Sequence, residues 1–259
     1  MRAAAGGGAA TPVAQVAQVD HIVIAAATLA EGVAWCEATL GATPGPGGRH
    51  ALFGTHNRLL KIESEVHPLA YLEVIAADPQ APAPARRRWF GLDEPTTQQR
   101  LAAHGPQLLH VVVRTTAIDA QLAALAAAGV DAGVALAASR ATPQGELRWR
   151  IAVRPDGRLL FGGALPTLIE WPAEAFAAVA AAGTARHPAT AMPASPVRLR
   201  EVSLIGLPDA VAAALRLGAV TFMAQSPKAP APAEGGLGVT LDTPRGPVTL
   251  HAPPPQETR

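Results

Sequence analysis

The chain has 259 residues and one cysteine, Cys36, so it can bury a substantial core but can form no internal disulfide. Its 21 Lys and Arg nearly balance its 20 Asp and Glu, which leaves no basic field for nucleic acid or an anionic membrane surface. No stretch of about 18 strongly apolar residues is present, so no membrane span is expected and a cytoplasmic location is predicted.

Proline and glycine divide the chain. Residues 1–17 are small residues interrupted by glycines, a poor signal-peptide core, and predict a flexible tail. Proline-rich stretches at 78–88 and 185–196 indicate linkers. The predicted organisation is a first module (18–78), a Pro-rich linker with the RRRWF sequence as its anchor (79–105), a second module (106–174), a helix or linker (175–196), and a shorter third module (197–259).

The first segment opens at His21 with HIVI, a run typical of a buried strand. A helix is expected next, because Thr28 and Glu31 have capping-box spacing and Gly41 stands where the helix should end. RHALF, HNRLLKI and AYLEVIA then predict three short strands. In the linker that follows, Trp89 and Phe90 are expected to anchor the chain onto the module.

The second segment repeats this order from His110, with a helix that ends at Gly129 and the strands ELRWRIAV and TLIEW. The third begins at Glu201 and closes with GLGVTL and GPVTLHA around a turn. The chain is therefore predicted to be α+β, with tandem βαβββ modules and a shorter, βαββ-like third module. Glu201 and His251 in that module are expected to be structural.

Two histidines and two glutamates occupy matching places in the repeat. His21 and His110 begin the first strands, while Glu73 and Glu170 lie within the last strands. A buried lone carboxylate is costly unless it is paired or bound to a cation. Two imidazoles and two carboxylates suit a divalent ion, and such N/O ligation admits Ni, Co, Zn, Mn or Fe. The alternative is that the histidines bond to strand ends and the glutamates pair with nearby arginines.

The sequence resembles the glyoxalase-like branch of the vicinal oxygen chelate superfamily. The stretches that carry the resemblance are DHIVIAAATLAEGVAWCEATLGATP, GRHALFGTHNRLLKI, YLEVIAADP, RRRWFGLDEP and TLDTPRGPVTL. The resemblance implies paired modules whose curved mixed sheets form a cup, with metal ligands at His21, Glu73, His110 and Glu170. It also implies a metal-dependent lyase or isomerase that acts on a small carbonyl compound through a metal-stabilised enediolate, with Glu170 as the catalytic base.

Two other functions remain open on this scaffold. An extradiol-type ring-cleaving dioxygenase needs two histidines and one carboxylate on Fe(II), which His21, His110 and Glu170 could supply. A metal-free small-molecule binding protein would use the cup alone.

Polar residues near the cup are candidates for substrate binding: His50, His56, Asn57 and Arg58 in the first module, and Arg148 and Arg150 in the second. His56 and Arg58 share one face of a strand and Asn57 the other. Arg148 and Arg150 form an anion clamp if they point inward and an exposed ladder if they point outward. The expected partner is a small carbonyl substrate, with no nucleic acid and no membrane, and a homodimer is possible.

Overall fold

The computed structural model describes residues 16–223 and 236–252. In the first module, strand β1 (Gln18–Ala25) leads into helix α1 (Leu29–Leu40), followed by β2 (Gly45–His50), β3 (Thr55–Lys61) and β4 (Tyr71–Ala77). The Thr28 hydroxyl accepts a hydrogen bond from the Glu31 N–H at 3.2 Å, and Gly41 ends the helix at φ 69°. Local capping therefore sets both ends of α1, as the sequence predicts.

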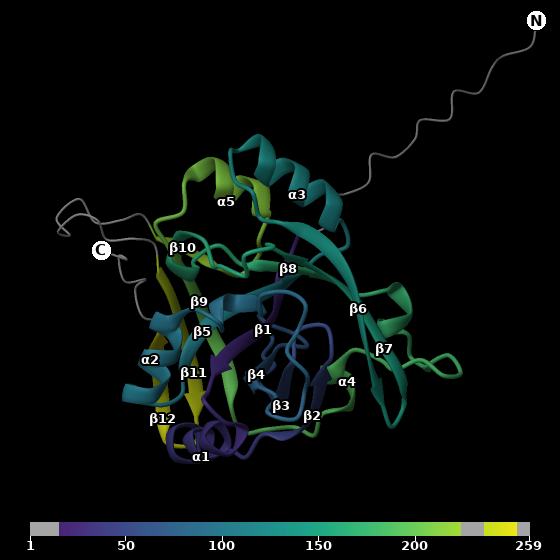
Figure 1. Cartoon of the computed structure of the whole chain (residues 1–259), viewed down its shortest axis with the longest axis vertical. Helices are drawn as coiled ribbons and strands as arrows, with labels where there is room; N and C mark the ends of the chain where they lie inside the picture. Colours follow the sequence, from purple (N-terminus) through teal and green to yellow (C-terminus); the bar gives the residue numbers. More distant parts are fainter. Residues whose placement is uncertain (1–15, 224–235, 253–259) are drawn as a thin grey trace, which may run out of the picture.

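The second module has the same order: β5 (Gln107–Arg114), α3 (Ile118–Ala127), β6 (Val134–Thr142), β7 (Gly145–Val153) and β8 (Thr167–Glu170). The two modules form one curved eight-stranded sheet in the order β2-β3-β4-β1-β5-β8-β7-β6 (Figure 1). β1 and β5 pair antiparallel at its centre, and the edge strands β2 and β6 contact each other. The predicted fold class, paired modules around a cup, is confirmed.

The segment between the first and second modules contains more regular structure than the segment between the second and third modules. Between the modules lie a 3-10 turn, η1 (Trp89–Gly91), and helix α2 (Pro95–His104). Trp89 and Phe90 are buried, and Trp89 stacks on Phe53 with ring centroids 3.9 Å apart. The segment after β8 forms only the short turns η3 (Ala173–Phe176) and α4 (Pro188–Ala191), and Val179 is 82% exposed. Its alanines offer no apolar stripe that could hold a longer helix against the core.

The third module contains β9 (Arg198–Ile205), α5 (Asp209–Leu215), β10 (Thr221–Met223), β11 (Gly236–Thr243) and β12 (Gly246–His251). The sequence predicts a βαββ-like unit, and the short strand β10 is an addition to it. These strands form a separate sheet in the order β10-β9-β11-β12, and α5 lies beside α3 (Figure 1). The side chains of Glu201 and His251 are exposed.

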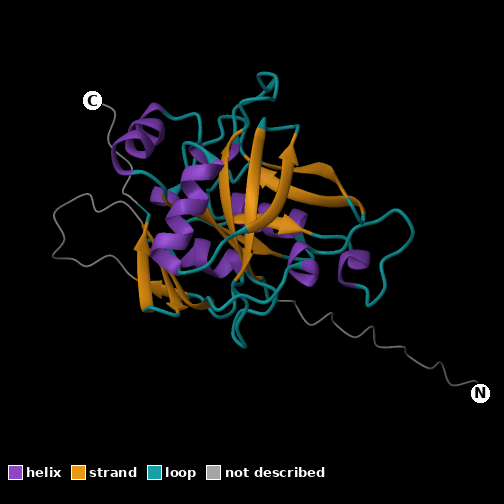
Figure 2. Ribbon diagram, turned by 90° about the horizontal axis from the view of Figure 1, so that it is seen from below, coloured by secondary structure: helices purple, strands orange, loops and turns teal. Residues whose placement is uncertain are grey.

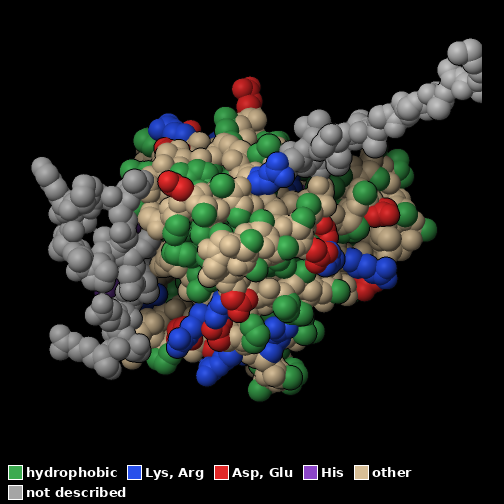
Figure 3. Space-filling view, turned by 90° about the horizontal axis from the view of Figure 1, so that it is seen from above, with side chains coloured by type: hydrophobic (Ala, Val, Ile, Leu, Met, Phe, Trp, Pro, Cys, Tyr) green, Lys and Arg blue, Asp and Glu red, His purple; other side chains and the backbone are tan. Residues whose placement is uncertain are grey.

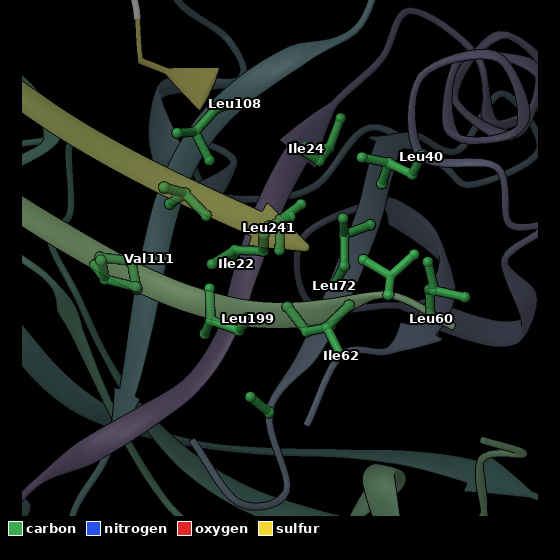
Figure 4. Packing of buried hydrophobic residues seen from close by; sticks show 14 of the residues in the cluster. Ile22, Ile24, Leu40, Leu60, Ile62, Leu72, Leu108, Val111, Leu199 and Leu241 are labelled. Carbon is green, nitrogen blue, oxygen red and sulfur yellow. The ribbon is translucent and has the colours of Figure 1, made fainter. Parts of the chain in front are cut away.

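The third module packs against the outer face of the first. Leu199 and Leu241 meet Ile22, Ile24 and Leu72 in one hydrophobic cluster (Figure 4). Because adjacent strand residues point to opposite faces, this contact leaves Val23 and Ile75 on the other face, in the cluster that surrounds the cup. The third module thus supplies the outer layer of the central sheet, while helices flank the strands (Figure 2).

The surface shows no concentration of one charge sign on the face seen in Figure 3, where basic and acidic side chains lie side by side. Among the described residues, no helix is long and apolar enough to span a membrane. Cys36 is buried in α1, and burial raises the pKa of its thiol to about 12, which fits the packing role expected of a free cysteine.

Candidate active site

The cup lies on the concave side of the first module and is closed by residues of the second. It is open at its mouth, and its cavity volume is about 30 Å³. Its polar lining comes from β1 to β4 and from β6, while its apolar wall comes from the η1 turn and from β7 and β8. The main lining side chains are His21, His50, Asn57, Tyr71, Glu73, Trp89, Phe90, Arg140, Leu147, Trp149, Ile169 and Trp171.

His21 is held in one orientation by the residue that precedes it. The Asp20 carboxylate lies 2.7 Å from Nδ1 of His21, and both side chains are buried. The His21 ring also stacks on Tyr71, with centroids 4.7 Å apart and planes 21° apart. A carboxylate at Nδ1 favours the tautomer with its proton there, so Nε2 keeps a free lone pair. That atom faces the cup, 3.6 Å from Oε2 of Glu73.

Asp20 has two further partners. The indole N–H of Trp171 donates to Oδ2 at 2.9 Å, and Nε2 of His187 lies 3.1 Å from the same atom. His187 accepts the Ala189 N–H at Nδ1, so its proton sits on Nε2 and is donated to Asp20. Burial alone would raise the pKa of Asp20, but His187 and then His21 outweigh it and hold the pKa well below its usual range. Asp20 is therefore an ionised, fully bonded carboxylate beneath His21.

Glu73 is oriented by Asn57. The backbone N–H of Gly48 donates to Oδ1 of Asn57 at 2.7 Å, which leaves the amide nitrogen to donate to Oε1 of Glu73 at 2.5 Å. Nε2 of His50 lies 4.0 Å from the same Glu73 oxygen. The second oxygen of Glu73 remains directed at His21. Glu73 and His21 thus present a carboxylate oxygen and an imidazole nitrogen to one point of the cup.

His50 and Asn57 are the two hairpin candidates that reach the cup. Nδ1 of His50 lies 3.0 Å from the Thr55 hydroxyl, and the ring meets Trp89 edge-on. Burial, aided by Arg140, lowers the pKa of His50 to about 3, so the ring is neutral at physiological pH. His56 and Arg58 point to the opposite face, where His56 lies 3.9 Å from Asp78 and Arg58 is exposed.

His110 is buried on the cup side of β5 but does not join His21 and Glu73. Its Nε2 accepts the Thr167 N–H at 3.2 Å and lies 3.0 Å from the Thr167 hydroxyl. Phe90 covers the ring, with centroids 5.3 Å apart. Burial lowers the pKa of His110 to about 3, with the Gly163 backbone opposing the shift. Nε2 of His110 is therefore already occupied by hydrogen bonds to Thr167.

Glu170 points away from the cup. Its Oε2 accepts from Arg150 at 2.8 Å, and its Oε1 accepts the N–H of Ile118 at the start of α3. The pairing register explains the placement, because Val23 pairs with Glu73 in the first module and Val112 pairs with Thr167 in the second. Since Val23 and Val112 follow His21 and His110 by two residues, Thr167 is the counterpart of Glu73. Glu170 lies three residues further along the chain.

Arg148 and Arg150 form the exposed ladder rather than an anion clamp. Arg148 pairs with Glu146, while Arg150 bridges Asp119 and Glu170 on the helix side of the sheet. Their neighbours Leu147 and Trp149 turn inward to the cup. Because side chains alternate between the two faces of β7, this strand contributes apolar side chains to the cup.

The predicted four-residue metal site is not assembled. Of its members, His21 and Glu73 meet, His110 is bonded to Thr167, and Glu170 binds Arg150. Throughout residues 16–223 and 236–252, no group of three His, Cys, Asp or Glu side chains is placed to hold a metal ion. The donor set therefore does not fit the divalent ion, and the same placement leaves the dioxygenase triad of His21, His110 and Glu170 unformed.

Sequence reasoning missed Asp20, His187 and Arg140. Asp20 directly precedes His21, so strand alternation predicts that it points away from His21, yet the register of β1 shifts between Val19 and His21 and lets the two side chains meet. An acidic residue next to a candidate histidine was the available signal. His187 and Arg140 come from distant segments, and no local pattern marks them.

Comparison with known proteins gives one family match and several solved structures with low sequence identity. Residues 19–220 match a family model described as a glyoxalase-like domain. A hypothetical protein from Staphylococcus aureus is 14% identical over 74% of this chain and 70% of its own, with a TM-score of 0.48. A Streptomyces coelicolor methylmalonyl-CoA epimerase variant is 21% identical, covering 61% of this chain and 97% of its own, with a TM-score of 0.38.

A methylmalonyl-CoA epimerase from Mycobacterium tuberculosis is 19% identical, covering 63% of this chain and 93% of its own, with a TM-score of 0.37. No protein with a curated description matches the sequence.

Proposed function

The chain belongs to the glyoxalase-like domain family of the vicinal oxygen chelate superfamily, and we propose that it is an isomerase or lyase that moves a proton at a carbon beside a carbonyl group. The observation that carries this proposal is the pair His21 and Glu73. Their Nε2 and Oε2 atoms are 3.6 Å apart in a buried cup, too far for a direct hydrogen bond but close enough for one substrate carbon to reach both.

His21 is the base in this proposal. The C–H bond of the substrate breaks, its proton goes to Nε2, and its electron pair is delocalised onto the carbonyl oxygen as an enolate. Asp20 accepts a hydrogen bond from the Nδ1–H of His21, and its negative charge balances the positive charge that the ring acquires. Delivery of a proton to the neighbouring carbonyl carbon of a hydroxycarbonyl compound completes an isomerisation, whereas its return to the same carbon restores the substrate.

Glu73 is the second proton carrier. Asn57 fixes one carboxylate oxygen and leaves the other free to receive or return a proton on its side of the substrate. Because the two atoms are only 3.6 Å apart, both carriers lie on the same side of a substrate carbon, so one can remove a proton and the other can deliver a proton to the neighbouring atom. Every step uses side chains of this chain, and none passes through a metal ion.

The test is exchange of substrate hydrogen with solvent. Wild-type protein in D₂O is expected to incorporate deuterium beside the carbonyl of phenylpyruvate or hydroxyacetone faster than the uncatalysed reaction, measured by proton NMR. His21→Gln is expected to lower the catalysed rate by about 10²–10⁴. His104→Gln, at an exposed position in α2, is the matched control and should keep the full rate. Equal rates for wild type and His21→Gln would contradict the proposal.

Metal removal separates this proposal from metal-dependent chemistry. Because the donors do not converge, protein dialysed against a chelator is expected to keep its exchange activity, and elemental analysis should find less than one divalent ion per chain. A stoichiometric ion that is lost in His110→Ala, together with loss of activity in chelator, would instead support the four-residue site.

A metal-free small-molecule binding protein is the second candidate. The aromatic wall formed by Trp89, Trp149 and Trp171 favours it, since such surfaces bind apolar ligands without chemistry. Ligand binding without deuterium exchange for any bound carbonyl compound would support this candidate over the first.

A further inference from the structure

Arg140 is a charged side chain of the second module that lines the cup of the first. It lies on β6, where Leu136 and Ala138 point to the core around the cup, and alternation directs Arg140 to the same side. Burial lowers the pKa of Arg140, while the nearby Tyr71 and Glu73 oppose that shift. A guanidinium keeps its charge under these conditions. The cup therefore contains a permanent positive charge.

This guanidinium has spare hydrogen-bonding capacity. Its hydrogen bond in the described part of the chain runs from Nη1 to the Gly47 carbonyl oxygen, at a long 3.4 Å. None of the described carboxylates lies within 4 Å of it, in contrast to Arg150, which has two carboxylate partners. A guanidinium offers five N–H donors, and a partly buried one is stabilised by an anion that accepts two of them.

The strand opposite is shaped to admit Arg140. β2 carries glycine at positions 47 and 48, and a Cβ atom on Gly48 would overlap the Arg140 guanidinium. A Cβ atom on Gly47 would overlap Asn57, which orients Glu73. Because glycine has no side chain, Gly47 and Gly48 leave room at one edge of the cup for the Arg140 guanidinium and for Asn57, which orients the Glu73 carboxylate.

From this arrangement we propose that Arg140 binds the carboxylate of the substrate, and that the substrate class is small monocarboxylic acids with a flat apolar or aromatic body. The body would lie against Trp89 and Trp149, which line the same cup. A monoanion is favoured over a phosphate dianion because Glu73 contributes one negative charge to the cup and repels a second. This inference names the substrate of the proposed proton transfer and rests on the cup being its site.

The test compares ligands that differ in charge but hardly in shape. Isothermal titration calorimetry with phenylacetate and phenylacetamide is expected to show at least about 10-fold tighter binding of the carboxylate to wild-type protein. Phenylphosphonate, which carries a second negative charge near neutral pH, is expected to bind more weakly than phenylacetate.

Two substitutions locate the effect. Arg140→Gln is expected to weaken phenylacetate binding by about 10- to 100-fold and to leave phenylacetamide binding unchanged, which also shows that the variant cup is folded. Arg140→Lys should recover part of the loss because it restores the charge without the planar fork. Arg58→Gln, exposed on the far side of β3, is the control and should bind both ligands like wild type.

Equal affinity of wild type for the acid and the amide would overturn the inference, as would an equal loss of both ligands in Arg140→Gln. Tighter binding of phenylphosphonate would assign the site to a dianion and also overturn it. Binding is measured without turnover, so acid-selective binding without deuterium exchange would refute the proposed proton transfer alone. Exchange on hydroxyacetone without acid-selective binding would refute only the assignment of Arg140.

Discussion

Replacing Asp20 with alanine is expected to lower the free energy of unfolding by about 3–5 kcal/mol. The substitution leaves the donors of His21, Trp171 and His187 without their shared acceptor in a buried site. Urea denaturation followed by tryptophan fluorescence measures the loss. Asp242→Ala is the control: Asp242 pairs with Arg200 at the surface, so its removal should cost less than about 1 kcal/mol. Equal losses in the two variants would contradict the role of Asp20.

The conservative variant Asp20→Asn tests the chemistry rather than the packing. Its amide oxygen can still accept from Trp171 and His187, but its amide nitrogen would then face Nδ1 of His21. The His21 proton would move to Nε2, and the ring could no longer accept a substrate proton there. The deuterium exchange rate is expected to fall by about 10²–10⁴ while the protein stays folded. An unchanged rate would show that the Asp20–His21 contact has no part in the proton transfer.

Acid is expected to destabilise the protein well above the pH at which carboxylates titrate. Burial lowers the pKa of both His50 and His110 to about 3, whereas an unfolded histidine titrates near 6.5. Between these values the unfolded chain binds protons that the folded chain does not, so stability is complete above about pH 6.5 and falls as the pH decreases. The loss at pH 5 should reach about 2 kcal/mol for each of the two histidines.

Urea denaturation at pH 7.5 and at pH 5 checks this expectation. His110→Gln removes one of the two histidines with the pKa lowered to about 3 and should reduce the loss between the two pH values by about 2 kcal/mol. His104→Gln changes an exposed histidine and should leave the loss as in wild type. A free energy of unfolding that is the same at both pH values would refute the assignment of His50 and His110 as neutral buried rings. Asp20 does not contribute to the difference between pH 7.5 and pH 5. Its pKa is lowered in the folded protein, so its contribution to stability is lost only at pH values below the usual pKa of a carboxyl group.

Local patterns were sufficient for most of the helices and strands and for two of the residues that line the cup. Thr28 and Gly41 marked the ends of α1, and the repeated order of strand and helix led to the paired modules. His21 and Glu73 were found because each is a polar residue within an apolar strand. Both lie in the first module, where the pairing of β1 with β4 places them on the same side.

The candidate residues of the second module, whose strand positions were matched by residue type, do not join His21 and Glu73. Glu170 looked like the counterpart of Glu73, but pairing of β8 with β5 places Thr167 there and turns Glu170 toward α3. In a strand that is apolar throughout, the sequence does not show which face meets the cup. A shift of an odd number of residues exchanges the two faces.

Capping and periodicity act over a few residues, so the amino-acid sequence was enough to indicate the repeated order of strands and helix, the ends of α1 and the two polar residues His21 and Glu73 within apolar strands. Which side chains join that pair depends on how distant parts of the chain pack together. Asp20 contacts His21 where the register of β1 is irregular. His187 contacts Asp20 from a turn far along the chain, and Arg140 of the second module lies against Gly48 of the first. These contacts depend on how separate segments pack, which no local pattern encodes.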